Sequence, residues 1–239
     1  LAANAMLAQR VSSINSLSTL CEATEADIGE VARAVGTDSR IGPRFLNAGI
    51  GFGGSCFKKD ILNLVYLCEN YGLTQVAQYW QQVLAINDYQ QERFVKSILC
   101  SMFDTVAGKR IAVLGFAFKA DTGDTRESPA IAVCRRLAEE KADVVVTDPE
   151  ALDNARQDLA DFGDRIKYES DPYKAANGAH ALVVLTEWKR YEQLDYAKII
   201  EAMARPAFLF DGRRRLDHKK LFDIGFNVYA IGRAPMVRK

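Results

Sequence analysis

The sequence predicts an α/β protein in which an all-α part over residues 1–104 is followed by a Rossmann-like, mostly parallel α/β part over residues 105–239. Two patterns carry this prediction. The first part has apolar residues at helical spacing and no strand pattern. The second part contains five short apolar runs separated by helical or polar sequence, which is how a parallel sheet alternates with its crossover helices.

Four helices are expected in the first part. Apolar residues at spacings of three and four form one face over residues 1–21. A second helix is expected to open at Thr24, with Asp27 as its capping-box partner, and to close at Gly36.

The other two helices follow a glycine-dense loop. The segment KKDILNLVYLCENYG has helical spacing and ends at Gly72. Thr74 is then expected to cap a run that reaches Phe103.

The five apolar runs of the second part are RIAVLGF, ADVVVTD, HALVVLTE, AFLFD and FNVYAIG. Runs that are apolar throughout are typical of strands buried on both faces, so we expect a mostly parallel sheet with helices on either side. Ser128 and Pro129 suit the cap and the first position of the helix that follows the first strand.

The charge balance argues against two classes of partner. Lys plus Arg equal Asp plus Glu at 31 each, so no bulk positive field attracts nucleic acid or an acidic membrane. No run approaches the roughly 20 apolar residues of a membrane span, and the start does not resemble a signal peptide. We therefore expect neither nucleic acid nor a membrane as partner.

The cysteines indicate a reducing compartment. The five cysteines are widely spaced and include no CxxC pair, which argues against a disulfide framework and against a zinc site. We expect a cytoplasmic protein without a metal. The chain starts without Met, inside a helix-like stretch rich in Ala and Leu, which we interpret as an internal cut in a longer protein.

The segment GIGFGGSC, residues 49–56, contains the dinucleotide pattern GxGxxG at Gly49, Gly51 and Gly54. Its context argues against that interpretation, because the dinucleotide pattern needs a strand before it, whereas PRFLNA precedes it here. Glycines at this density instead allow the backbone to approach a ligand closely and present Cys56 at a helix start.

Cys56 is the candidate nucleophile. The positive end of the helix dipole and the following lysines, Lys58 and Lys59, favour the thiolate form that a nucleophile needs. Asp60 lies four residues on, on the same helical face, where it can orient a water molecule or accept a proton. The competing interpretation is a small buried cysteine packed beside a turn, which is what we expect of the other four cysteines.

Polar residues gather where the predicted strands end. Lys119 and Arg126 follow the first strand, Asp148 ends the second, and Arg213 follows the run AFLFD. Because the carboxyl ends of parallel strands meet at one edge of the sheet, the cations among these residues are expected to converge there. Lys119 and Arg213 in particular would suit the phosphate oxygens of an anionic, nucleotide-like ligand. The competing interpretation is a set of solvated loop charges.

Four segments carry a resemblance to a known family. LAANAMLAQRVSSINSLSTLCE, GFGGSCFKKD, GFAFKADTGDTRESPA and FDGR together resemble the nucleotide-sugar dehydrogenases, above all the branch acting on UDP-glucose, and the likeness extends from Leu1 to about Gly232. The resemblance implies a helical central domain that forms the dimer, within a homodimer or a higher homo-oligomer, and a Rossmann-like domain that binds UDP. It also implies that the NAD-binding amino-terminal domain is absent, so we expect this fragment alone to be inactive.

The resemblance also implies a reaction and roles for residues. The family oxidises the C6 alcohol of UDP-glucose to the acid of UDP-glucuronate with two NAD, through a cysteine thiohemiacetal and thioester. Cys56 is similar to that nucleophile, Asp60 to the aspartate that acts on water, and Asn4 to the asparagine near the sugar oxyanion. Arg126 resembles an arginine that contacts NAD phosphate. The implied substrate residues are Arg40 (reaching a neighbouring subunit's site), Phe45, Gly49, Ile50, Gly51, Phe52, Gly53, Lys119 and Arg213.

Two departures leave the choice of nucleotide sugar open. Asn47 stands where close relatives often carry Lys, and Lys58 where Gln or Pro is common. One alternative is a dehydrogenase for GDP-mannose or a UDP-N-acetylhexosamine. The other is a catalytically silent module for nucleotide binding or oligomerisation.

Overall fold

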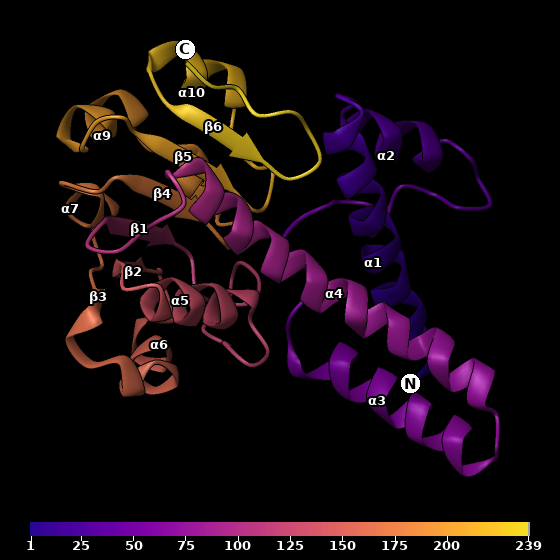
Figure 1. Ribbon diagram of the computed structural model, residues 1–239. Helices are drawn as coiled ribbons and strands as arrows, with labels where there is room; N and C mark the ends of the chain where they lie inside the picture. Colours follow the sequence, from indigo (N-terminus) through magenta and orange to yellow (C-terminus); the bar gives the residue numbers. More distant parts are fainter. Residues whose placement is uncertain (239) are drawn as a thin grey trace.

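The computed structural model describes residues 1–238. Its amino-terminal part is helical. Helices α3 and α4 form an antiparallel hairpin, and α1 packs against both of them (Figure 1). A small core of Ala5, Ala8, Ile61, Val65 and Val83 lies between the three helices. The helices are α1 (Ala2–Ala23), α2 (Ile28–Gly36), α3 (Ser55–Asn70) and α4 (Thr74–Ser101).

The carboxyl-terminal part is a doubly wound α/β unit. Its six strands are all parallel and run in the order β3-β2-β1-β4-β5-β6, which is the Rossmann order. The strands are β1 (Arg110–Leu114), β2 (Asp143–Thr147), β3 (Ile166–Tyr168), β4 (Ala181–Val184), β5 (Phe208–Asp211) and β6 (Asn227–Ala230). The helices are α5 (Pro129–Glu139), α6 (Leu152–Asp158), the 3-10 helix η1 (Ala160–Arg165), α7 (Pro172–Ala176), α8 (Lys189–Glu192), α9 (Tyr196–Ala202) and α10 (His218–Ile224).

Both faces of the sheet are buried, as the uniformly apolar runs predict. Along β1, Ile111 and Val113 belong to a core shared with α5, whereas Ala112 and Leu114 belong to a core shared with α9 and α10. Alternate side chains of one strand therefore stabilise opposite layers.

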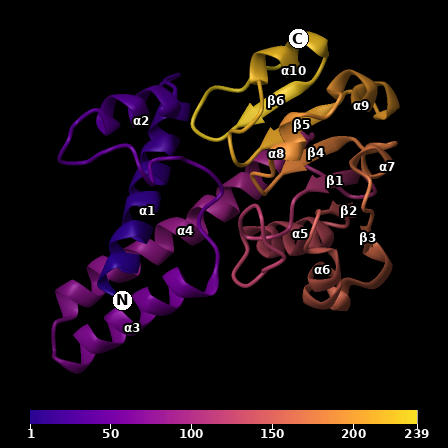
Figure 2. The same cartoon turned by 180° about the vertical axis from the view of Figure 1, so that it is seen from behind.

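Helix α4 connects the two parts. Its amino-terminal half lies in the hairpin, and its carboxyl-terminal half runs onto the α/β unit (Figure 2). There Phe94, Val95 and Ile98 are buried in the same core as strand β1. Because α4 is packed into both cores, it holds the two parts together at the place where their loops meet.

Several expected element boundaries are wrong. Thr24 does not open α2, because its hydroxyl donates to the carbonyl oxygen of Leu20 and ends α1, while Asp27 caps α2 by accepting from the amide of Gly29. Thr74 is the first residue of α4 and makes no cap bond. The sequence also did not predict β3. Ser128 caps α5 as expected, by accepting from the amide of Ala130.

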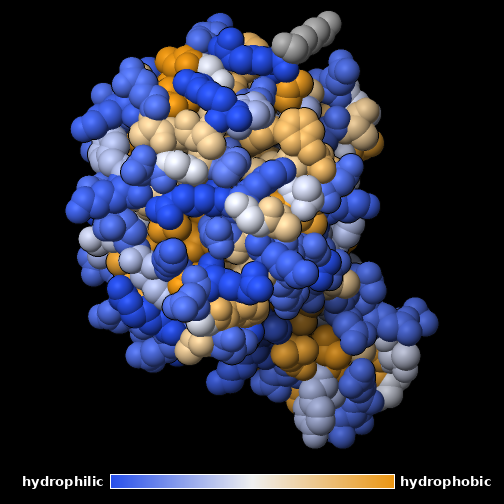
Figure 3. Space-filling view, turned by 60° about the vertical axis from the view of Figure 1, so that its left-hand side comes forward, coloured by the Kyte–Doolittle hydropathy of each residue, from blue (hydrophilic) through white to orange (hydrophobic). Residues whose placement is uncertain are grey.

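The surface differs between the two parts. Figure 3 shows a face that is mostly hydrophilic over the α/β unit. The same face carries an apolar patch on the lobe at the lower right, where the α3–α4 hairpin projects. None of the helices in residues 1–238 combines the length and the apolar character needed to cross a bilayer.

Candidate active site

Cys56 is the second residue of α3 and is exposed. Gly54 takes the cap position with φ 82, a conformation that a residue without Cβ adopts freely. Asp60 follows one turn later, and its carboxylate Oδ2 accepts a 2.7 Å hydrogen bond from Nδ2 of Asn4 on α1. The structure thus brings together the three residues predicted as catalytic, two on α3 and one on the adjacent helix.

The glycine loop of residues 49–54 is not an open anion cradle. Four of its amides already donate to acceptors of the protein, and these acceptors come from α1, from α4 and from the loops after β1 and β5. The bonds run from Gly49 to Oδ1 of Asn15 (2.9 Å), from Ile50 to the carbonyl of Gly212 (2.9 Å), from Phe52 to Oδ1 of Asn87 (2.8 Å) and from Gly54 to the carbonyl of Arg126 (2.9 Å). No strand precedes the loop, so the GxGxxG match is coincidental.

Two glycines of this loop lie where the helical part and the α/β unit are in close contact. A Cβ built on Gly53 would lie 2.5 Å from the carbonyl oxygen of Glu127, and one built on Gly54 would lie 3.0 Å from the ring of Phe118. Side chains at these positions would push the α/β unit away from α3. The glycines therefore bring the loop after β1 directly against the start of the helix that carries Cys56.

Arg213 binds three loops at this junction. Its Nε donates to the carbonyl of Leu185 at 2.8 Å, and its terminal nitrogens donate to Gly51 at 3.0 Å and Phe118 at 3.3 Å. Only 14% of its side chain is exposed. Burial lowers the pKa of Arg213, while the neighbouring carboxylates of Glu187 and Asp211 oppose that shift. The guanidinium of Arg213, which was predicted to bind phosphate, thus also donates hydrogen bonds to carbonyl groups of the protein.

Lys119 and Arg126 are the exposed cations of the loop after β1. Lys119 lies over the ring of Phe118, 5.4 Å from its centre. Arg126 forms a two-pronged pair with Asp124 and keeps 70% of its side chain exposed. Hydrogen bonds from Arg126 lower the pKa of Asp124, although partial burial opposes this. The backbone carbonyl of Arg126 accepts from the amide of Gly54, two residues before Cys56, so the loop that carries Arg126 lies against the start of α3.

Phe45 and Arg40 lie on the segment between α2 and the glycine loop. Phe45 has φ 60, and its ring lies 6.4 Å from that of Phe57 on α3. Arg10 anchors the segment by donating to the carbonyls of residues 41, 42 and 44. Arg40 points into solvent with 87% of its side chain exposed and pairs with Asp38. The structure therefore places Phe45 beside α3 and leaves Arg40 apart from the other predicted residues.

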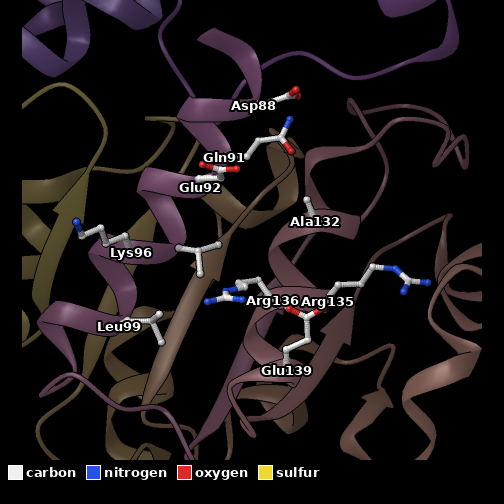
Figure 4. A pocket seen from close by; sticks show the side chains of 10 residues that line it. Asp88, Gln91, Glu92, Lys96, Leu99, Ala132, Arg135, Arg136 and Glu139 are labelled. Carbon is white, nitrogen blue, oxygen red and sulfur yellow. Dashed lines mark hydrogen bonds and ion pairs between the residues drawn. The ribbon is translucent and has the colours of Figure 1, made fainter. Parts of the chain in front are cut away.

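Two cavities adjoin the predicted residues. One of 510 Å³ lies between α2, the glycine loop and the segment after β5, and it is lined by Asn47, Gly49 and Arg213 among others. Another of 400 Å³ is lined by Phe52, Gly53 and side chains of α4 and α5. A third cavity, of 720 Å³, lies between α4 and α5 and is lined by mixed charges (Figure 4). None of the predicted site residues lines this third cavity, whereas Gly49, Phe52, Gly53 and Arg213 line the first two.

Sequence reasoning missed the residues that hold the glycine loop from behind. Asn15, Asn87 and Gln90 are buried, and Gln90 Nε2 donates to the carbonyl of Gly49 at 2.7 Å. Their one signal is a spacing of three between Asn87 and Gln90, which places both side chains on one face of α4. Nothing in that spacing identifies the loop as their partner.

The sheet order, together with cations after the carboxyl ends of β1 and β5, defines the class of Rossmann-like nucleotide-binding proteins. The chain belongs to the UDP-glucose/GDP-mannose dehydrogenase family: residues 1–89 match the family's central domain and residues 112–218 match its UDP binding domain. The resemblance drawn from the four sequence segments is thereby confirmed.

Individual relatives agree with this assignment. The chain is 55% identical to UDP-glucose 6-dehydrogenase 2 of Oryza sativa subsp. japonica, over 98% of this chain and 52% of the rice protein. It is 54% identical to UDP-glucose 6-dehydrogenase of Drosophila melanogaster, over 98% of this chain and 51% of the fly protein. The chain thus spans about half the length of the curated relatives it matches.

A solved structure agrees as well. The UDP-glucose dehydrogenase of the archaeon Pyrobaculum islandicum superimposes with a TM-score of 0.82 at 34% identity, over 98% of this chain and 50% of the archaeal chain. The predicted fold class, a helical part followed by a parallel α/β part, is confirmed.

Proposed function

We propose that the chain carries the thiol and the UDP-sugar-binding half of an NAD-dependent UDP-glucose 6-dehydrogenase, which oxidises UDP-glucose to UDP-glucuronate. The observation that carries this proposal is the exposed Cys56 at the start of α3, with the Asn4–Asp60 pair one turn away. The names of the relatives at 54–55% identity support the choice of UDP-glucose.

The thiol accounts for the second of two oxidations at C6 of the sugar. Sγ of Cys56 adds to the carbonyl carbon of the aldehyde, forming a C–S bond and a thiohemiacetal. Loss of the C6 hydride gives a thioester, and water then cleaves the C–S bond, releasing the acid and restoring the thiol. Asp60 accepts a proton from that water, and Asn4 holds the Asp60 carboxylate in place.

Arg126 fits the phosphate of a dinucleotide. Its guanidinium is exposed, and its backbone carbonyl binds the amide of Gly54 at the start of the thiol helix, whereas four amides of the glycine loop are already engaged. NAD, when bound, accepts the hydride. This chain's own residues supply the covalent bond to the sugar, the proton acceptor and one cation for the cofactor.

The 510 Å³ cavity between α2 and the segment after β5 is the proposed place of the UDP group. Gly49 and Arg213 line it. We propose Lys119 as a second cation, because Arg213 donates to the carbonyl of the preceding residue, Phe118. The N–H donors of Arg213 that are not bonded to carbonyl groups can bind a phosphate.

We propose a homodimer formed through the helical part. Large apolar side chains are exposed on the α3–α4 hairpin, and exposed apolar patches on soluble proteins mark contact surfaces. They include Leu62, Tyr66, Leu67, Tyr71, Leu73, Val76 and Tyr79. Sedimentation of the chain and of its Tyr66→Glu variant tests this, since a wild type that sediments as a monomer at micromolar concentration contradicts it.

Alkylation of the cysteines tests the substrate and the thiol together. All five cysteines are unpaired, and only Cys56 and Cys100 are exposed, so iodoacetamide is expected to label these two first. UDP-glucose is expected to slow labelling of Cys56 at least about fivefold and to leave Cys100, the internal control, unchanged.

We also propose a cytoplasmic location, where thiols stay reduced.

The competing functions give different outcomes in the same experiment. Protection of Cys56 by GDP-mannose or by a UDP-N-acetylhexosamine, but not by UDP-glucose, transfers the proposal to that branch of the family. Labelling of Cys56 that no nucleotide sugar slows, together with no calorimetric binding of UDP, favours the silent module.

A further inference from the structure

Asp148 is a buried carboxylate to which the proposed reaction assigns no role. It follows β2, and only 2% of the residue is exposed. In dinucleotide-binding Rossmann domains the acid at this place contacts a ribose hydroxyl. Here both carboxylate oxygens are already committed to the protein. Oδ2 accepts from the amides of Phe116 (2.6 Å) and Ala117 (3.0 Å) and from Nε1 of Trp188 (3.2 Å), and Oδ1 accepts from the amides of Glu150 and Ala151 (2.9 Å each).

The bonds to Oδ2 fix the loop that leaves β1. Its carbonyl groups are fixed as well: Oγ of Ser128 donates to Phe116 at 2.7 Å, and Oγ1 of Thr186 donates to Ala117 at 2.6 Å. Arg213 donates to the next carbonyl, that of Phe118. Every carbonyl of residues 116–118 therefore accepts a hydrogen bond. Within the described residues, Asp148 is the sole acceptor for the amides of residues 116 and 117.

Phe118 transmits this position to the thiol helix. Its ring lies against Gly54, the cap of α3, and its Cβ lies against Gly53. The amide of Gly54 donates to the carbonyl of Arg126 in the same loop at 2.9 Å. Lys119, one of the proposed substrate cations, is the next residue along. Any movement of residues 116–118 therefore displaces both a cation of the UDP site and the turn that precedes Cys56.

We propose that Asp148 is a positioning residue of the UDP-sugar site, holding the loop of residues 115–119 so that Lys119 and the Gly53–Gly54 turn stay in place together. This proposal rests on the proposed function, because it assigns Asp148 to that same site. It also explains why the carboxylate at the end of β2 is not available to a ribose: both of its oxygens already accept hydrogen bonds from the protein.

The test compares Asp148→Asn with Asp171→Asn. Both remove one charge from an aspartate of the same domain that accepts backbone amide hydrogen bonds, but Asp171 accepts from the amide of Tyr173 at the start of α7 and makes no recorded hydrogen bond to the loop. D148N turns an amide NH2 or a weaker acceptor toward the donors of Phe116, Ala117 and Trp188. We expect D148N to weaken UDP binding about tenfold or more in calorimetry well below the melting temperature, and D171N to leave it unchanged.

Hydrogen exchange supplies a readout independent of UDP. In D148N the amides of Phe116, Ala117 and Gly54 are expected to exchange at least about tenfold faster, with those of α1 unchanged. A uniform increase over all helices, or no increase at Gly54, overturns the proposal. Failure of the wild type to bind UDP counts against the proposed function instead, and the exchange rates still decide the role of Asp148.

A second variant keeps the test decisive if D148N does not fold. Thr186→Val conserves volume and removes only the bond to the carbonyl of Ala117. It is expected to weaken UDP binding about threefold and to speed exchange at Gly54. A folded T186V with wild-type UDP affinity and wild-type exchange at Gly54 overturns the proposal.

Discussion

The side-chain amide of Asn4 donates a 2.7 Å hydrogen bond to the Asp60 carboxylate, which joins α1 to α3 one turn after Cys56. The two residues are 56 positions apart in the chain. Removing the amide deprives the Asp60 carboxylate, 23% of whose side chain is exposed, of this hydrogen bond.

The first prediction concerns this bond. Asn4→Ala is expected to lower the free energy of unfolding by about 1–2 kcal/mol, because hydrogen bonds to charged groups contribute that much. Urea denaturation measures the change. Gln9→Ala removes an exposed bond to Ser13 on the same helix and is expected to cost less than about 0.5 kcal/mol. Equal losses in the two variants contradict a special role for the pair.

Members of the candidate site could be proposed from the sequence where their signals are local. Cys56 follows a dense set of glycines at a helix start, and Asp60 is one turn away, so both can be inferred from a few neighbouring residues. Asn4 could be proposed only by resemblance, since nothing in its own helix indicates a partner so far along the chain. The buried amides of Asn15 and Asn87 were missed for the same reason.

The fold was predictable because most of its strands are apolar throughout. The elements that were missed or wrongly bounded in the prediction have local causes. Strand β3 has only three residues, Ile166–Tyr168, and the middle one is an exposed lysine, so no apolar run marks it. Thr24 and Asp27 are both good cap residues, and the hydroxyl of Thr24 bonds backwards to Leu20. Sequence could not show which of the two begins α2.

The second prediction concerns Asp27, the cap of α2. Burial tends to raise the pKa of its carboxyl, but the Gly29 amide and the guanidinium groups of Arg214 and Arg233 outweigh burial, so the pKa lies below the ordinary 3.8. A carboxyl with a lowered pKa stabilises the folded state at pH values above its unfolded pKa, and this contribution is lost as the pH falls through the folded pKa.

Asp27→Asn is therefore expected to be about 1 kcal/mol less stable than the wild type at pH 7. The difference is expected to shrink as the pH falls below about 4. Urea denaturation at pH 7 and pH 3 checks both statements. Asp161, whose pKa Arg135 lowers at an exposed site, provides the control Asp161→Asn, with a smaller difference at pH 7. A D27N deficit that grows in acid contradicts the argument.

The third prediction concerns Lys58, one of the two departures from the family pattern. Its Nζ lies 2.8 Å from Oε2 of Glu127, and both side chains are nearly half exposed. Exposed ion pairs contribute little, so a double-mutant cycle of Lys58→Gln and Glu127→Gln is expected to give a coupling below about 1 kcal/mol. The coupling should fall in 1 M salt. A larger coupling that salt does not reduce contradicts a purely exposed pair.

The last prediction concerns Arg213, whose flat guanidinium donates to carbonyls in three separate loops. A lysine is a single point of charge and cannot reach Leu185, Gly51 and Phe118 at once, so buried carbonyl oxygens lose their donors. Arg213→Lys is expected to lower the free energy of unfolding by about 2–4 kcal/mol. Arg215→Lys, at a half-exposed pair with Glu192, is the matched control in the same RRR run and is expected to cost less than about 0.5 kcal/mol.

Calorimetry then separates the two uses of Arg213. If the guanidinium also contacts phosphate, R213K weakens UDP binding even at temperatures where the variant is fully folded, because lysine lacks the two-pronged contact. If Arg213 serves only to join the loops, UDP affinity falls in parallel with hydrogen-exchange protection of the bonded amides of Phe52 and Phe118. Wild-type affinity and wild-type stability in R213K together contradict both roles.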